Sequence, residues 1–100
     1  MSVIDIRREV ELAIKTIVLS SYTRYVYLRA DKVKKVNPRL RDTYVSYIGK
    51  IMNKILHEYE EKGLIKILGV KRNHVSKFYL EVLKPYFDYA EKIKREEVIA

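Results

Sequence analysis

Hydrophobic residues recur every three or four positions over residues 5–20, with charged residues between them. This spacing places the apolar side chains along one side of an α-helix. We therefore predict a helix here, with Ser2 or Asp5 capping its first turn. Residues 22–29 form a run of aromatic and β-branched side chains, which favours a short strand.

A second, shorter helix is expected over residues 32–36. Asp31 would cap it, and Val33 and Val36 would contact the core. The helix must end near Asn37-Pro38, because a residue that precedes proline avoids helical backbone angles. Arg39-Leu40-Arg41 would then form a turn.

The longest amphipathic stretch covers residues 42–62. Its start has two candidates: Asp42 as the cap, or Asn37 as the cap with Pro38 in the first helical turn. Gly63 is the expected C-terminal cap. The side expected in the core holds Tyr44, Val45, Ile48, Met52, Ile55 and Tyr59, and the opposite side holds Thr43, Ser46, Lys50, Asn53 and His57.

Two strand-like runs follow, over residues 64–70 and 75–82, and Lys71-Arg72-Asn73-His74 joins them. The pattern predicts a β-hairpin with a basic tip. Alternation in its second strand directs Phe78, Leu80 and Val82 to one face. A final helix is expected over about residues 86–97, opened by Pro85. Its apolar stripe is Leu83, Phe87, Ala90 and Ile93.

A length of 100 residues with 48% hydrophobic residues indicates one folded domain that has no need of metal or disulfides. Cysteine is absent, which excludes thiol chemistry. No apolar run is long enough to span a bilayer, and the first residues do not form a signal peptide, so a cytoplasmic protein is expected. The absence of Gln and the abundance of Lys, Glu and Ile lean towards a thermophile.

The net charge of +8 is concentrated in the middle of the chain. Residues 29–77 hold 13 Lys or Arg against 5 Asp or Glu, whereas the flanking segments nearly cancel. Such segregation is typical of a surface that meets a polyanion. A charged face that merely keeps the protein in solution is the alternative.

Catalytic chemistry finds little support in the sequence. His57 and His74 lie in different predicted elements, and neither has a partner at metal-binding spacing. The glutamates at 58, 60 and 61 do not converge on one metal, and no glycine-rich phosphate loop is present. We therefore expect no enzyme activity, no metal and no cofactor, and no small-molecule ligand is evident. The nine tyrosines are more typical of core packing than of base stacking.

The order helix, strand, helix, turn, helix, hairpin resembles the winged helix-turn-helix proteins. Thr43-Tyr44-Val45-Ser46 is similar to the start of a recognition helix in this family, and Glu61-Lys62-Gly63-Leu64-Ile65 is similar to the junction between that helix and the wing. The resemblance covers about residues 5–82 and implies a mainly α fold with a small β-hairpin. Residues 1–83 would form the winged-helix domain, and 84–100 an extra helix for dimerisation or packing, as in small archaeal DNA-binding and chromatin-type proteins.

The resemblance implies double-stranded DNA as the partner, with residues 42–62 as recognition helix, residues 64–82 as wing, and a role as transcriptional regulator or nucleoid-associated architectural protein. The implied DNA-contacting residues are Arg39, Arg41, Thr43, Ser46, Tyr47, Lys50, Asn53, Lys54, Lys71, Arg72, Asn73, His74 and Lys77. A protein-interaction subunit of a larger assembly and an RNA-binding module are the alternatives.

The recognition helix is about two turns longer than is usual in that family, so its far end must pack on something else. We expect the stripe Leu83, Phe87, Ala90 and Ile93 to form the interface of a twofold homodimer. The alternative is that the last helix folds back on the first helix of its own chain.

Overall fold

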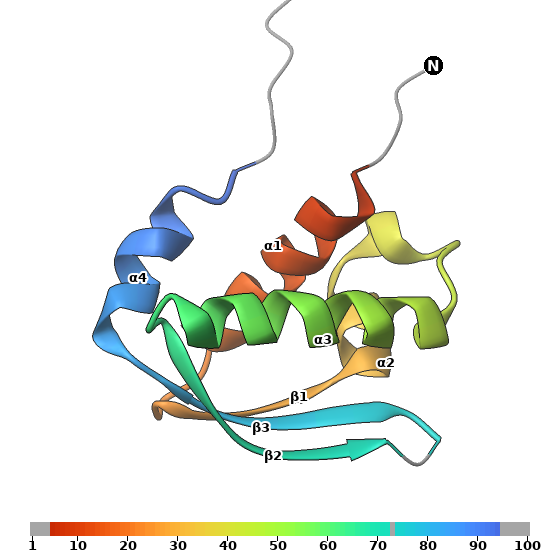
Figure 1. Cartoon of the computed structure of the whole chain (residues 1–100). Helices are drawn as coiled ribbons and strands as arrows, with labels where there is room; N and C mark the ends of the chain where they lie inside the picture. The colour runs from red at the N-terminus through yellow and green to blue at the C-terminus, as the bar shows by residue number, and fades with distance from the viewer. Residues whose placement is uncertain (1–4, 73, 95–100) are drawn as a thin grey trace, which may run out of the picture.

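The computed structural model of the chain describes residues 5–72 and 74–94. The described residues contain four α-helices, a short 3-10 helix and one antiparallel sheet, in the order expected from the sequence (Figure 1). The elements are α1 (Ile6–Leu19), β1 (Tyr25–Arg29), α2 (Ala30–Val36), the 3-10 helix η1 (Pro38–Leu40), α3 (Val45–Glu61), β2 (Ile65–Arg72), β3 (Ser76–Val82) and α4 (Lys84–Glu91).

The sheet has three strands in the order β1-β3-β2, and both pairings are antiparallel. The hairpin strands extend to Arg72 and Ser76, so Lys71 and Arg72 belong to a strand and not to the expected loop. Strand backbone tolerates these charges because both side chains remain exposed on an edge strand. Four helices beside a three-stranded antiparallel sheet make the fold α+β; the expected helices and hairpin are present, and the hairpin belongs to a larger sheet.

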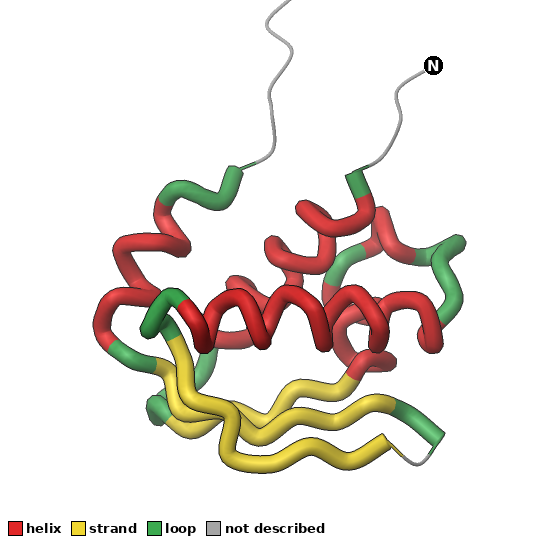
Figure 2. Tube along the Cα trace, in the orientation of Figure 1, coloured by secondary structure: helices red, strands yellow, loops and turns green. Residues whose placement is uncertain are grey.

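The helices lie together on one side of the sheet, and no described helix covers the other side (Figure 2). Strand alternation explains this arrangement, since every second residue points to the helices. Val26 and Leu28 in β1 are buried, and so are Phe78, Leu80 and Val82 in β3, as predicted for β3. Tyr25 and Tyr27 alternate with them and are exposed.

Helix α1 begins where the sequence predicted, because the Asp5 side chain accepts a hydrogen bond from the Arg8 backbone N at 3.2 Å. Helix α2 begins two residues before the predicted start, with Arg29 at the N-cap position in place of Asp31. A buried polar contact joins the two regions. The Asn37 side chain donates to the backbone O (2.8 Å) and Oε1 (3.0 Å) of Glu9.

Both candidate caps for the long helix were wrong. Tyr44 occupies the N-cap position of α3, and its side chain makes no capping hydrogen bond. Asn37 caps η1 instead, accepting from Arg39 N at 3.1 Å, and the Thr43 N–H donates to Leu40 O, which keeps 42–43 in a turn. Tyr44, expected in the core, is 81% exposed because it precedes the first helical turn.

Helix α3 ends within one residue of the prediction: Lys62 occupies the C-cap position, and Gly63, the predicted cap, follows it. Gly63 has a φ of 73°, a conformation that side chains other than glycine rarely adopt. The Leu64 N–H donates back to Tyr59 O at 2.9 Å, which closes the helix end. The chain then enters β2 directly.

Helix α4 corrects the predicted stripe of the last helix. Ala90 and Ile93 are buried within the chain, but Tyr86 takes the central buried place expected of Phe87. Phe87 is 45% exposed and Leu83 is half-buried. The helical face turns this way because Tyr86 packs edge-on against Tyr59 of α3, with ring centroids 5.8 Å apart.

The segment after α4 also contacts the first helix. Lys15 Nζ donates to Ile93 O at 3.2 Å, and Arg8 donates to Lys94 O at 3.0 Å. Ala90 and Ile93 are thus buried within their own chain. The residues after α4 contact α1, the helix named in the alternative, whereas α4 itself contacts α3 through Tyr86. The helix was expected to extend to residue 97, and residues 95–97 lie outside the described part of the chain.

Candidate nucleic-acid interface

A groove of about 590 Å³ separates the first half of α3 from the end of the hairpin. One wall comes from α3, and the other from the last residue of β2, the connection and the first residue of β3. The lining residues are Val45, Ser46, Tyr47, Gly49, Lys50, Ile51, Asn53, Lys54, Arg72, His74, Val75 and Ser76.

Gly49 sets how closely the two walls approach at the base of the groove. A Cβ atom at this position would lie 2.6 Å from Ser76 Oγ and 3.1 Å from Ser76 Cβ. Real Cβ atoms essentially never come as close as the first distance, and the second is tighter than nine in ten real Cβ contacts. A glycine inside a helix costs stability, so this one is explained by the packing of α3 on the start of β3.

A hydrogen bond crosses the groove from one wall to the other. Arg72 at the end of β2 donates from Nη2 to Asn53 Oδ1 of α3 over 2.7 Å. Strand alternation makes this possible, because Arg72 pairs with Ser76 in register and points towards the helix. The contact orients the Asn53 amide and holds a guanidinium beside the exposed side of α3.

The electrostatics of the groove are one-sided. Lys50, Lys54 and Arg72 contribute positive charge, and no carboxylate is among the lining residues. The first turn of α3 also contains no acidic residue. Its free backbone N–H groups and the helix dipole add a positive potential at this end. The groove therefore favours an anion.

The predicted site residues fall into three groups. Ser46, Tyr47, Lys50, Asn53 and Lys54 of α3 line the groove together with Arg72 and His74 of the hairpin. Arg39, Arg41 and Thr43 lie in or after η1, outside the groove lining; both arginines are exposed. Lys71 and Lys77 pair in register on the opposite face of the sheet from Arg72. Asn73 lies outside the described residues.

The sequence interpretation treated the hairpin tip as one basic cluster, and the structure divides it between two faces. Each side chain follows the alternation of its strand, which extends further than predicted. The interpretation also missed Gly49, Val75 and Ser76 as groove residues. An isolated glycine within a strongly helical pattern was the available signal for a close approach.

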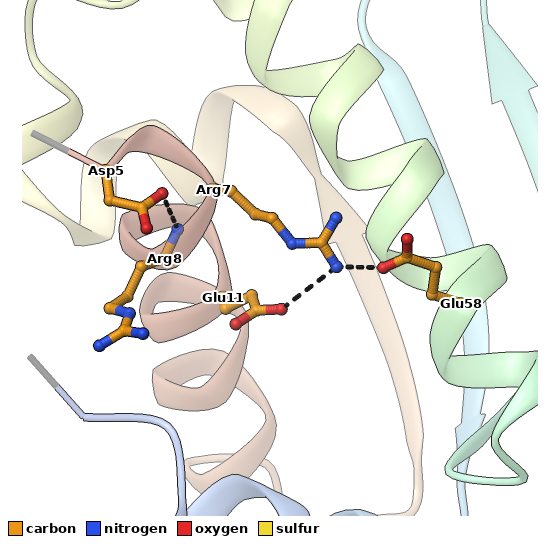
Figure 3. Close-up of polar contacts among 5 residues, drawn as sticks. All are labelled: Asp5, Arg7, Arg8, Glu11 and Glu58. Carbon is orange, nitrogen blue, oxygen red and sulfur yellow. Dashed lines mark hydrogen bonds and ion pairs between the residues drawn. The ribbon is translucent and has the colours of Figure 1, made fainter.

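The far half of α3 is held by an ion-pair cluster (Figure 3). Arg7 of α1 donates to Glu58 of α3 and lies 3.6 Å from Glu11. The hydrogen bond from Arg7 lowers the pKa of Glu58, whereas burial raises the pKa of Glu11. Glu58 is thus a structural partner of Arg7, and nearby Glu60 accepts from Ile67 N at 2.7 Å. The Arg7–Glu58 contact thus joins α1 to α3, and the Glu60–Ile67 contact joins α3 to β2.

Within residues 5–72 and 74–94, no cluster of three or more His, Asp or Glu side chains is placed to hold a metal ion. Likewise, none of the described helices is both long and apolar enough to cross a membrane. Comparisons of the chain with protein-family models, with curated proteins and with solved structures found no match. The winged-helix resemblance therefore remains a prediction from the sequence.

Proposed function

We propose that this protein binds double-stranded DNA without catalysing a reaction on it. In this proposal the first half of α3 enters the major groove and the hairpin contacts the neighbouring backbone, as in winged helix-turn-helix proteins. The observation that carries the proposal is the groove between α3 and the hairpin. It brings three cations, a helix N-terminus and polar side chains together without a carboxylate in the lining.

We assign each groove residue to the phosphate backbone or to the base edges by the length and position of its side chain. Ser46, in the first turn of α3, suits a phosphate contact beside the free amides of the helix. Lys50 is exposed one turn further along the same helix face and has the length to reach a base edge. Arg72 orients the Asn53 amide, whose Oδ1 keeps a second lone pair and whose NH₂ can donate, the two groups that pair with adenine.

The arginines of the η1 turn extend the same positive surface. Arg39 and Arg41 are exposed, and the turn that carries them is anchored because Asn37 bonds both Glu9 and Arg39 N. An ordered backbone presents a cation at lower entropic cost than a flexible loop does. We assign these arginines to phosphate contacts, which position the protein and carry no direct sequence information.

The proposed cellular role is that of a transcriptional regulator or a nucleoid-associated architectural protein. Specific base reading by Lys50 and Asn53 would favour the regulator, and equal binding to all duplexes would favour the architectural role. A homodimer remains part of the proposal. Its contact must centre on exposed Phe87, because Ala90 and Ile93 are buried in their own chain.

The experiment compares groove variants with a distant lysine variant in fluorescence-anisotropy titrations of a labelled duplex. Arg72→Ala should weaken binding to every duplex, and Lys50→Ala or Asn53→Ala should change the preference between sequences by roughly 1–3 kcal/mol at a contacted base pair. Lys92→Ala is the matched control, because exposed Lys92 follows α4, at the opposite end of the molecule from the hairpin tip (Figure 1).

Equal effects of Lys92→Ala and Arg72→Ala would contradict a binding site in the groove. Tighter binding to a hairpin RNA than to duplex DNA would replace the proposal by the RNA-binding alternative. No response to duplex DNA, together with salt-insensitive association with an acidic protein, would favour the protein-interaction alternative.

A further inference from the structure

The side of the sheet that faces away from the helices carries three exposed tyrosines. Tyr25, Tyr27 and Tyr79 are 55%, 37% and 46% exposed, and we call them the tyrosine face. Tyr27 and Tyr79 are register partners on β1 and β3, with ring centroids 4.5 Å apart. Tyr25 stands two residues from Tyr27 on the same strand face, about 7 Å along it. The described helices all lie on the other side of the sheet (Figure 2).

The β2 residue paired with Tyr79 is a glycine. Gly69 of β2 is the register partner of Tyr79 and places no side chain over this ring; the register shift between Ile67 and Gly69 leaves Leu68, 51% exposed, as the extra residue beside it. An added Cβ at Gly69 would meet Tyr79 Cδ2 at an ordinary contact distance of 3.9 Å. Its φ is not positive, so backbone strain does not require a glycine here. A glycine beside the bulge therefore leaves Tyr79 without the side chain that a β-branched residue would place against it.

The surroundings of the tyrosine face are mainly basic. Lys71 and Lys77 pair across the strands in the row next to Tyr79, and Lys66 lies opposite Glu81 on the other side. Glu81 is paired with Arg24 at 3.9 Å, and Arg24 also lies over the ring of Tyr25 at 5.6 Å. Arg29 is paired with Asp31 at 3.1 Å. Lys71 and Lys77 form no ion pair with a carboxylate of the described residues, so two adjacent lysines border the aromatic rings.

We propose that the tyrosine face is a second nucleic-acid surface, which binds single strands by stacking unpaired bases on Tyr27 and Tyr79 while Lys71 and Lys77 contact the backbone. Aromatic rings flanked by cations are the combination that single strands require, because each base offers a flat face and each phosphate a charge. A duplex hides its base faces, so this surface does not suit duplex DNA. It lies on the opposite side of the sheet from the groove at α3.

The structural alternative is that the ring pair only stabilises the sheet. Cross-strand aromatic pairs contribute modestly to sheet stability, and that role requires neither an open ring face nor neighbouring lysines. A stacking role predicts that phenylalanine replaces tyrosine without loss, whereas alanine does not. It also predicts that covering Tyr79 from β2 abolishes binding and leaves the fold intact.

The test is a fluorescence-anisotropy titration with labelled oligothymidylate and oligouridylate of about 12 nucleotides, a length within the range that single-strand sites cover. We expect the full-length protein to bind at least one of them at about 50 mM salt. Tyr27→Ala and Tyr79→Ala should each weaken binding at least about fivefold. The double Tyr27→Phe/Tyr79→Phe variant should bind within about twofold of wild type, because phenyl rings also stack.

Gly69→Val should weaken binding like Tyr79→Ala while circular dichroism remains unchanged, since valine is favoured in strands. The groove variants provide the distinction from the proposed duplex function. Lys50→Ala/Arg72→Ala should weaken duplex binding and leave single-strand binding within about twofold, and the tyrosine variants should do the reverse.

Absence of single-strand binding by the wild type would overturn this inference. It would not affect the proposed function, which is tested separately by duplex binding. Wild-type affinity in the folded Tyr27→Ala/Tyr79→Ala variant would also overturn it. The same conclusion would follow if single-strand binding were lost in the groove variant and kept in the tyrosine variants, because the strand would then lie in the groove.

Discussion

Replacing Gly49 with alanine tests whether α3 and the hairpin approach as closely as described. Alanine in a helix interior is favoured over glycine by about 1 kcal/mol, so an unhindered helix would gain stability. Here the new methyl group would stand 2.6 Å from Ser76 Oγ and 3.1 Å from Ser76 Cβ. Rotation of the serine side chain relieves the first contact only, because Cβ belongs to the strand and moves with its backbone.

The magnitude follows from these two opposing effects. Overpacking of a well-packed interior costs about 1–3 kcal/mol. The gain of about 1 kcal/mol in helix propensity offsets part of this cost. Gly49→Ala should therefore lower the unfolding free energy by about 0–2 kcal/mol. In a Ser76→Gly background both close contacts disappear, and the same change should stabilise the protein by about 1 kcal/mol.

The assay is a double-mutant cycle of Gly49→Ala and Ser76→Gly, measured by urea unfolding followed by circular dichroism. The expected interaction between the two positions is about 1–3 kcal/mol, the size of the overpacking that Ser76→Gly removes. The reasoning would be refuted if Gly49→Ala stabilised the protein equally in both backgrounds. In that case the walls of the groove would not meet at Gly49.

Three further predictions concern packing and charge outside the groove. The buried Tyr86 hydroxyl has no hydrogen-bond partner among the described residues, so Tyr86→Phe should raise the unfolding free energy by about 1 kcal/mol. The control Tyr44→Phe, at an exposed position, should leave it unchanged, and a lower unfolding free energy of Tyr86→Phe in urea would contradict the prediction. Burial raises the pKa of Glu11 above its unfolded value of 4.5, so folding binds the proton more tightly and wild-type stability falls as the pH rises through the interval between the two pKa values. Glu11→Gln lacks this loss, so its unfolding free energy relative to the wild type should increase as the pH rises above 4.5 in paired urea titrations. A difference independent of pH would count against this reasoning. Sedimentation equilibrium should give twice 11.9 kDa for the wild type and 11.9 kDa for Phe87→Asp; a monomeric wild type at tens of micromolar would exclude the dimer.

Local patterns in the sequence were sufficient for the elements and for several of their ends. Asp5 caps α1 and Gly63 closes α3 as predicted, because each acts on backbone groups within a few residues. The inward direction of Phe78, Leu80 and Val82 follows from strand alternation alone. These features depend on neighbours in the chain, so the sequence carries them directly.

Features that depend on distant neighbours were beyond the sequence pattern. The rotation of α4 about its axis, which buries Tyr86 and exposes Phe87, depends on the position of Tyr59 in α3. In the sequence, Tyr86 and Phe87 fit an apolar stripe equally well. Tyr44 belongs to the helical pattern but precedes the helix, because the turn after Leu40 continues through Thr43.

The candidate site was predictable in its residue types and not in its shape. Charge counting located the basic segment, and helical periodicity placed Ser46, Lys50 and Asn53 on one face. The groove itself exists because β3 begins beside Gly49, a contact between residues 27 positions apart. The division of Lys71 from Arg72 depends on the length of β2, which a boundary prediction does not resolve.

The salt dependence of duplex binding by the wild-type protein tests the central proposal most directly. Neutralising phosphates releases counterions, so the logarithm of the binding constant should fall linearly with the logarithm of salt concentration. Contact with about six phosphates per subunit predicts a slope near −5 and micromolar affinity at low salt. Arg72→Ala should make the slope less steep by about 1. No detectable duplex binding at about 50 mM salt, or an affinity that salt does not change, would contradict the proposal that this groove binds DNA.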